Sequence, residues 1–320
     1  MQFECRPPNP RDVMHLRPSN VTGALIVLGF SALTVLALWL SSLGKVGPWL
    51  VGQGLLAVAL VQWFVLLHEA GHRTLFQARR LHGLVGRLAS VFCAIPFTVW
   101  TSVHGQHHKW VGWQDLDPTT TSLVPRPLAR AERLIINTCW RWWIPLFTVL
   151  YRVSNFWHIP RLWRLFPERR HRIAFAVDML GLVLLYGALL AWLGPAQLAR
   201  LVGLGLLLSL VFLDVIMLSQ HTHIPVRQSG GARVRPYAAA EQGAFTRSLR
   251  FSPWFSAAVL LHFDAHELHH LYPAVPGYHL RRIAYQPPNE VAWWGWILRA
   301  RRVPAERFMF QNRDDTGETL

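Results

Sequence analysis

Cysteine is scarce in this sequence, and its three residues form no metal or disulfide motif. Cys5, Cys93 and Cys139 lie far apart and include no CxxC pair. Neither a zinc knuckle, a disulfide scaffold nor a four-cysteine iron–sulfur site is indicated. A cytochrome-type haem motif and a glycine-rich dinucleotide fingerprint are also missing. Any electrons that the protein uses must therefore come from another protein.

Acidic residues are also few: 17 Asp and Glu stand against 32 Lys and Arg, which gives a formal net charge of +15. The basic residues are nearly all arginine, and they flank apolar segments instead of forming a separate basic domain. Nucleic acid is therefore not the expected partner. Anionic lipid head groups explain the positive charge better.

The N-terminus carries no cleavable signal peptide pattern, because the first 20 residues are rich in proline and lack an apolar core. Internal repeats and low-complexity tracts are absent as well. We expect residues 1–320 to form a single domain that ends in a polar tail after about Arg313.

Long apolar runs dominate the rest of the chain, which is 52% apolar and contains 16 tryptophans. A helix needs about 20 apolar residues to cross a bilayer. We therefore predict an all-α membrane protein with four spans in two hairpins, joined by short turns at Gly44–Gly47 and at Gly194 and Pro195. A weaker apolar stretch at 83–103 contains Arg87 and Pro96, and we expect it to be re-entrant or interfacial. The predicted spans are residues 21–43, 48–67, 175–193 and 198–219.

The charges predict the orientation of these spans. With a cytoplasmic N-terminus, only Lys45 and Arg200 of the 32 basic residues lie at the outer turns, as the positive-inside rule requires. The N-terminus, the C-terminus and all the clustered histidines would then be cytoplasmic.

Histidine is abundant, and half of the 16 residues fall in three short motifs: HEAGH at 68–72, HGQHH at 104–108 and HELHH at 266–270. At this histidine frequency, chance would place HxxHH about 0.04 times in a chain of this length. It occurs twice, so a shared physical demand such as metal ligation is the better explanation.

The spacing within each motif suits metal ligation on a helix. Residues i and i+4 share one helix face, so His68 and His72 can point into one site. HxxHH adds a third imidazole. Eight clustered histidines exceed the three or four ligands of one zinc ion, which indicates two metal ions. Imidazole suits iron, copper, zinc and nickel, so ligand type alone leaves the metal open.

Carboxylates near the motifs could balance the metal charge and orient the ligands. The candidates are Glu69, Asp115, Asp117, Asp264 and Glu267.

With QHTHIP at 220–225, HELHHLYPAVPGYHL at 266–280 and DLDPTT at 115–120, the three motifs resemble the histidine boxes of the membrane fatty acid desaturase superfamily, in its acyl-lipid branch. The resemblance covers about Val21 to His279. It implies four transmembrane helices with a cytoplasmic helical cap that holds a diiron site, and dependence on dioxygen and two external electrons. The DLDPTT segment after the second box is similar to the acidic continuation of that box in bacterial members of the superfamily. This similarity implies a location in the bacterial inner membrane.

The resemblance also implies a set of metal ligands. One further histidine is expected after the fourth span, and we favour His221 over His223. Gln220, His223, His262, Asp264, Glu69, Asp115 and His279 are candidates for a further ligand or for supporting hydrogen bonds. The implied ligands are His68, His72, His104, His107, His108, His221, His266, His269 and His270.

The reaction that the resemblance implies is desaturation of a fatty acyl chain, since the PAVPGYH continuation of the third box is similar to the acyl-lipid group. A methylene C–H bond is too strong for acid–base catalysis, so this reaction requires a metal cofactor and dioxygen. A related hydroxylase, ketolase or acetylenase acting on a lipid or carotenoid remains the alternative. The acyl carrier could be a glycerolipid, coenzyme A or a carrier protein. Ferredoxin, rubredoxin or a cytochrome could supply the electrons.

Overall fold

The computed structural model describes residues 7–320, so Cys5 and Arg6 lie outside the described residues. The described chain is mostly helical and forms two compact units. We call Pro18–Ser102 with Val149–Leu213 the membrane unit, because it contains the long apolar helices. We call the rest, Val103–Thr148 and Asp214–Leu320 with the segment up to Arg17, the histidine unit.

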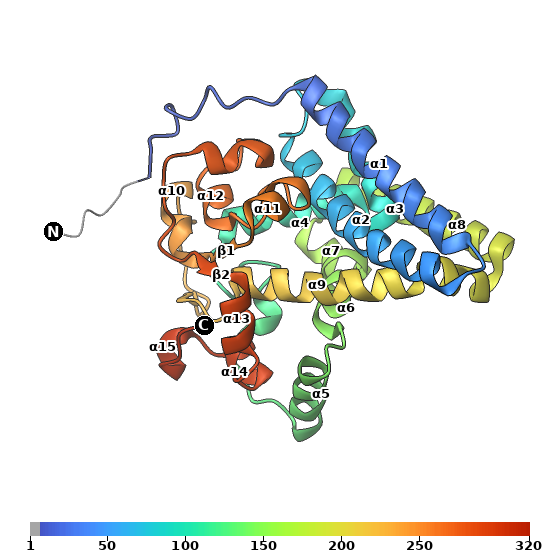
Figure 1. The fold of residues 1–320 in the computed structure, drawn as a ribbon. Coiled ribbons are helices and arrows are strands. Elements are labelled where there is room, and N and C mark those ends of the chain that lie inside the picture. Colours follow the sequence, from blue (N-terminus) through green and yellow to red (C-terminus); the bar gives the residue numbers. More distant parts are fainter. Residues whose placement is uncertain (1–6) are drawn as a thin grey trace. The chain divides into compact units, whose positions relative to one another are not determined.

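The first predicted hairpin is formed by α1 (Asn20–Ser42) and α2 (Val46–His72), which pack side by side (Figure 1). The hydroxyl of Ser19 accepts a hydrogen bond from the Thr22 N–H and caps the start of α1. Helix α2 continues five residues beyond the predicted end at Leu67. The whole HEAGH motif is therefore helical.

The segment predicted to form the second hairpin contains α8 (Arg169–Leu198), a π-helical turn η3 (Ala199–Gly203) and α9 (Leu204–His221). The backbone leaves helical geometry at Gly194, where φ is 75°. A positive φ suits glycine, and Pro195 cannot donate the next helical hydrogen bond. The break therefore lies at the predicted Gly-Pro turn, with helical backbone resuming directly after it.

The turns of the two hairpins lie together at one end of the membrane unit. The Trp49 indole N–H donates to the Arg200 carbonyl at 2.8 Å, and the Arg200 guanidinium donates to the Leu43 carbonyl at 3.3 Å. The fully buried Gln53 side chain donates to Leu201 O at 2.7 Å and accepts from the Gly205 N–H at 2.8 Å. Lys45 and Arg200 thus belong to turns at the same end of this unit, as the predicted orientation requires.

The weaker apolar stretch forms two helices, α3 (Arg79–Cys93) and α4 (Phe97–Trp110), bent by 97°. Ala94 adopts a left-handed conformation and Pro96 precedes α4, so the helix is interrupted where the sequence predicted. Such a bend is typical of a broken span or a re-entrant segment.

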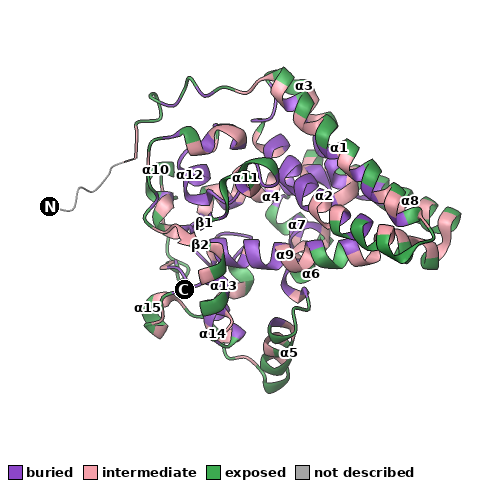
Figure 2. Ribbon diagram, in the orientation of Figure 1, coloured by how far each residue is buried: buried purple, intermediate pink, exposed green. Residues whose placement is uncertain are grey.

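Among residues 7–320, three helical stretches are long and apolar enough to cross a membrane, or four if α3 and α4 count together. Their outer faces carry exposed apolar side chains, including Val21, Leu25 and Trp192, and Figure 2 shows much of α1 and α8 as exposed. Exposed apolar surface of this extent is typical of contact with lipid. The three stretches are Asn20–Ser42, Val46–His72 and Arg169–His221.

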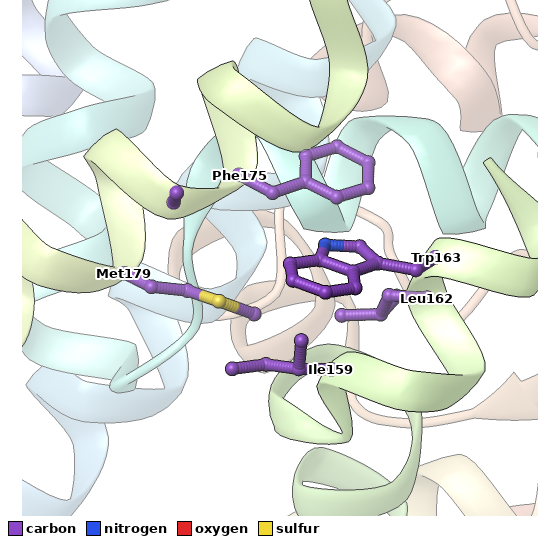
Figure 3. A pocket seen from close by; sticks show the side chains of 6 residues that line it. Ile159, Leu162, Trp163, Phe175 and Met179 are labelled. Atoms are coloured by element: carbon purple, nitrogen blue, oxygen red, sulfur yellow. The ribbon is translucent and has the colours of Figure 1, made fainter. Parts of the chain in front are cut away.

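Short helices complete the membrane unit: α6 (Leu146–Arg152), whose first three residues belong to the histidine unit, the π-helical η2 (Val153–Trp157) and α7 (Ile159–Leu165). Ile159, Leu162 and Trp163 of α7 face Phe175 and Met179 of α8 across an apolar cavity of about 30 Å³ (Figure 3).

The histidine unit consists of short helices around a core of its own. That core packs residues of the third histidine box segment, such as Leu268 and Leu271, against Val13 and Leu16 near the N-terminus. Strands β1 (Leu249–Arg250) and β2 (Val291–Ala292) pair in parallel. The helices not yet named are η1 (Thr121–Leu123), α5 (Arg130–Arg141), α10 (Ala239–Gln242), η4 (Gly243–Phe245), α11 (Pro253–Ala258), α12 (His266–Leu271), η5 (Gly277–Arg282), α13 (Trp293–Ala300), α14 (Ala305–Phe310) and α15 (Arg313–Thr316).

Candidate metal centre

The second histidine box lies in the last two turns of α4, so its side chains project at helical spacing. His104 and His108 are one turn apart, and their Nε2 atoms lie 3.1 Å from each other. His107 is buried on the adjacent face. The box therefore presents imidazoles in two directions, as HxxHH on a helix predicts.

The third box is the short helix α12, which is buried along its whole length (Figure 2). The preceding Leu261 and His262 have positive φ values, so the chain turns sharply before α12 begins. Within the helix, Nε2 of His266 lies 3.1 Å from Nε2 of His270.

The two boxes and the end of α9 together form two groups of imidazoles inside the histidine unit. In the first group, the ligand atoms of its four members lie within 4.8 Å of one another. His221 contributes from α9, with its Nε2 atom 2.7 Å from that of His266. In the second group, His108 Nε2 lies 3.1 Å from His269 Nε2 as well as from His104. The first group comprises His107, His221, His266 and His270, and the second comprises His104, His108 and His269.

The orientation of His107 is set by a buried carboxylate. Its Nδ1 lies 2.7 Å from Oδ2 of Asp117, which is 1% exposed. The other oxygen, Oδ1, accepts hydrogen bonds from the N–H and the hydroxyl of Thr119, both at 2.8 Å. With the Nδ1 proton held by Asp117, the Nε2 lone pair of His107 faces the first group. Such carboxylate–histidine pairs are typical beside protein-bound metals.

The orientation of His270 is set by Gln242, a residue that the sequence analysis did not single out. The Gln242 side-chain oxygen lies 3.0 Å from His270 Nδ1. Burial lowers the pKa of His270 well below its ordinary value, and the neighbouring imidazoles, His108 first, lower it further. His270 is therefore neutral at pH 7, the form in which histidine binds a metal.

Of the two histidines in the QHTH segment, only His221, the last residue of α9, lies in the first group. The turn after α9 is held by Arg247, which is 5% exposed and donates to the carbonyl oxygens of Ser219, Thr222 and His223. His223 points to the C-terminal segment instead, with its Nε2 atom 2.9 Å from the Thr316 hydroxyl and 3.0 Å from the Glu318 carbonyl. The sequence could not reveal the role of Arg247, because its partners are backbone atoms.

The first box lies in the last turn and a half of α2, in the membrane unit. The ring centroids of His68 and His72 are 4.7 Å apart, so the pair shares one helix face as predicted. Oε1 of Glu69 lies 3.3 Å from Nδ1 of His68. A Cβ atom on Gly71 would lie 2.1 Å from the Trp100 ring, which explains why the box contains glycine at this position.

The other candidate residues of the sequence analysis make structural contacts within the histidine unit. Asp115 accepts hydrogen bonds from Ser229 and Gly230. Asp264 accepts from Ser256 and Arg281, and Ser256 also contacts His262.

Three more candidates lie in or near the third box. Both carboxylate oxygens of the fully buried Glu267 accept backbone N–H groups, from Ser248 and Asn289. Gln220 donates to the Phe263 carbonyl. His279 lies in η5 and stacks edge-on against Tyr278.

The donor sets fit metal ions. Imidazole nitrogens bound at about 2.0–2.1 Å from an ion lie about 2.9 Å apart at right angles and about 3.4 Å apart in a tetrahedron. The Nε2 separations of 2.7, 3.1 and 3.4 Å in the first group lie close to this range. Iron, copper, zinc and nickel all accept such a set.

Comparison with known proteins agrees with this geometry. The family model described as fatty acid desaturase matches residues 46–295. Among curated proteins, the chain is 26% identical over 241 residues to a probable fatty acid desaturase of Sorghum bicolor, covering 68% of this chain and 58% of that protein.

The names of two further relatives include a protein electron donor. The chain is 27% identical to a chloroplastic sn-2 acyl-lipid omega-3 desaturase (ferredoxin) of Helianthus annuus, covering 81% of this chain and 58% of that one. It is 23% identical to an endoplasmic reticulum acyl-lipid omega-3 desaturase (cytochrome b5) of Arabidopsis thaliana, covering 79% and 66%. The chain thus spans less than two thirds of the length of these relatives.

Proposed function

Because the chain belongs to the fatty acid desaturase family, we propose that it introduces a double bond into a fatty acyl chain with two histidine-ligated iron ions. The observation that carries this proposal is the convergence of seven imidazoles from α4, α9 and α12 into two groups within the histidine unit. Neutral nitrogen donors in two groups suit two metal ions.

We propose nine histidines as iron ligands, seven from the histidine unit and two from the first box. His68 and His72 are included because they share one face of α2 and match the family motif. The proposed ligands are His68, His72, His104, His107, His108, His221, His266, His269 and His270.

The iron pair would supply the oxidising power for a reaction in which the acyl chain, dioxygen, two electrons and two protons yield an alkene and two waters. The chain's own residues hold the ligands in place. Asp117 keeps the proton of His107 on Nδ1, and the depressed pKa of His270 keeps that ring neutral. Arg247 holds the turn that presents His221.

We further propose that the protein crosses the bacterial inner membrane four times, with both termini and the metal centre cytoplasmic. The hydrogen-bonded turns at Leu43 and Arg200 support a common outer side for the two hairpins. Their scarcity of basic residues agrees with the positive-inside rule. The sequence contains no four-cysteine iron–sulfur motif, haem motif or dinucleotide fingerprint, which supports an external electron donor such as a ferredoxin, a rubredoxin or a cytochrome.

Expression in a host without membrane desaturases, followed by mass spectrometry of its fatty acids, tests the proposal. We expect new unsaturated fatty acids from the parent protein and none from His107→Ala, while His158→Ala, an exposed histidine outside the boxes, serves as the matched control. Purified protein should contain two irons per chain. Oxygenated products would favour the related hydroxylase, and one zinc per chain would reject both readings.

A further inference from the structure

We propose that Gln242 is a positioning residue for the metal centre: its side-chain amide sets the tautomer of His270 and ties the third histidine box to the backbone of the second. This inference rests on the proposed function. Gln242 ends the short helix α10 and is 4% exposed, whereas the preceding Glu241 is exposed and caps the start of the same helix.

The hydrogen bonds of Gln242 leave one orientation for its amide. The side-chain nitrogen lies 2.8 Å from the His108 carbonyl oxygen and 3.3 Å from the Tyr237 carbonyl oxygen. Carbonyl oxygens only accept hydrogen bonds, so the NH₂ group must face them. The amide oxygen therefore faces His270 Nδ1, at 3.0 Å.

This orientation in turn sets the proton position on His270. An amide oxygen only accepts, so His270 Nδ1 must carry the hydrogen. A neutral imidazole has one N–H, which leaves the lone pair on Nε2. That atom lies 3.1 Å from His266 Nε2 and 3.4 Å from His107 Nε2, inside the first imidazole group. The tautomer that Gln242 selects is thus the one that can bind a metal there.

Gln242 and Asp117 perform the same task with different charge. Asp117 holds His107 with a carboxylate, while Gln242 holds His270 with a neutral amide. The amide adds a second function, because its NH₂ group anchors His108, a member of the second imidazole group, through the His108 backbone. One buried side chain therefore contacts residues of both groups.

The residues that follow Gln242 support its position. The Asn289 side chain donates to the carbonyl oxygens of Gly243 and Thr246, at 3.1 and 3.2 Å. The backbone of Phe245 forms a hydrogen bond with His221. The segment from Gln242 to Phe245 thus contacts two ligands of the first group.

Two substitutions separate the acceptor from the donors of the amide. Gln242→Leu removes both, whereas Gln242→Glu keeps an oxygen acceptor for His270 Nδ1 but loses the NH₂ group, so that at most one of the His108 and Tyr237 carbonyl oxygens keeps a donor. We expect iron retention to follow the acceptor: the leucine variant should bind iron about 10–100-fold more weakly, and the glutamate variant should stay within a few fold of the parent. The thermal stability of the metal-free protein should fall in both.

The measurement is iron retained by the purified full-length protein across a series of chelator concentrations, together with melting temperatures before and after iron removal. Gln228→Leu, at an exposed glutamine of the same unit, is the matched control. If the leucine variant does not accumulate, Gln242→Met replaces it with the same expectation.

Three outcomes decide the inference. Weak iron binding in the leucine variant with near-parental binding in the glutamate variant supports it. Leucine-variant iron affinity within twofold of the parent, or equal losses in both variants, overturns it and leaves Gln242 a purely structural role. A parent protein that holds no iron refutes the proposed function itself, before any variant is compared.

Discussion

Replacing Asp117 with asparagine tests how the second box is held, because it changes one oxygen of a buried carboxylate to NH₂ without changing its size. In the parent, Oδ2 faces His107 Nδ1 and Oδ1 faces two donors of Thr119. The asparagine amide must place its NH₂ group on one side or the other. Both placements disrupt the metal ligand or its support.

If the NH₂ group faces Thr119, two donors oppose each other and a buried hydrogen bond is lost. If it faces His107, Nδ1 must become the acceptor, so the proton moves to Nε2 and blocks the lone pair that would bind the metal. A buried unsatisfied polar group costs about 1–3 kcal/mol. Converted at about 1.4 kcal/mol per factor of ten, this corresponds to a loss of metal affinity of about 5–150-fold.

The assay is iron retention against a chelator, with Asp115→Asn as the matched control from the same DLDPTT motif. Asp115 binds the turn at Ser229 and Gly230, so its substitution should change iron affinity by less than about threefold, since its partners include no histidine. An Asp117→Asn protein that retains iron as firmly as the Asp115→Asn protein would refute the reasoning.

Two further substitutions test the packing and the helix end around the boxes. Gly71→Ala places a methyl group 2.1 Å from the Trp100 ring and should lower the free energy of unfolding by about 1–3 kcal/mol. Thermal unfolding in detergent measures this loss of stability. The control is Gly54→Ala, in open space on the same helix, which should cost no stability. Equal melting temperatures for the two would contradict the packing argument. Arg247→Met leaves the carbonyl oxygens of Ser219, Thr222 and His223 without their donor and should cost about 1–3 kcal/mol and release iron more readily. The exposed Arg250→Met is its control, and an unchanged melting temperature at Arg247 would show that water replaces the guanidinium.

Features that depend on local sequence were predictable. The Gly194 and Pro195 break and the interruption at Pro96 follow from backbone chemistry that acts within a few residues. The helical spacing of the boxes follows from their own periodicity. The family membership was also readable, because several ordered motifs carry it together.

Features that depend on the path of the chain between distant segments were not predictable. Gln242 and Arg247 act mainly on backbone atoms of other segments, so their residue types carry no signal of the contact. Five carboxylates were equal candidates to orient a histidine, but only the fold brings Asp117 to His107 and sends Asp115 to the Ser229 turn. The directions of His221 and His223 likewise depend on the turn that Arg247 holds.

The π-helical turn η3 has a consequence for how the protein assembles. Its irregular backbone presents the carbonyl oxygens of Arg200 and Leu201 to Trp49 and Gln53 of the first hairpin. These bonds can form only after both segments have been synthesised, since their partners are about 150 residues apart. Until then, Gln53 keeps its hydrogen bond to Ser41 Oγ within the first hairpin, but its amide oxygen would lie in lipid without the Gly205 donor, which is costly. The first hairpin should therefore be held by the insertion machinery, or by a chaperone, until the second hairpin is synthesised.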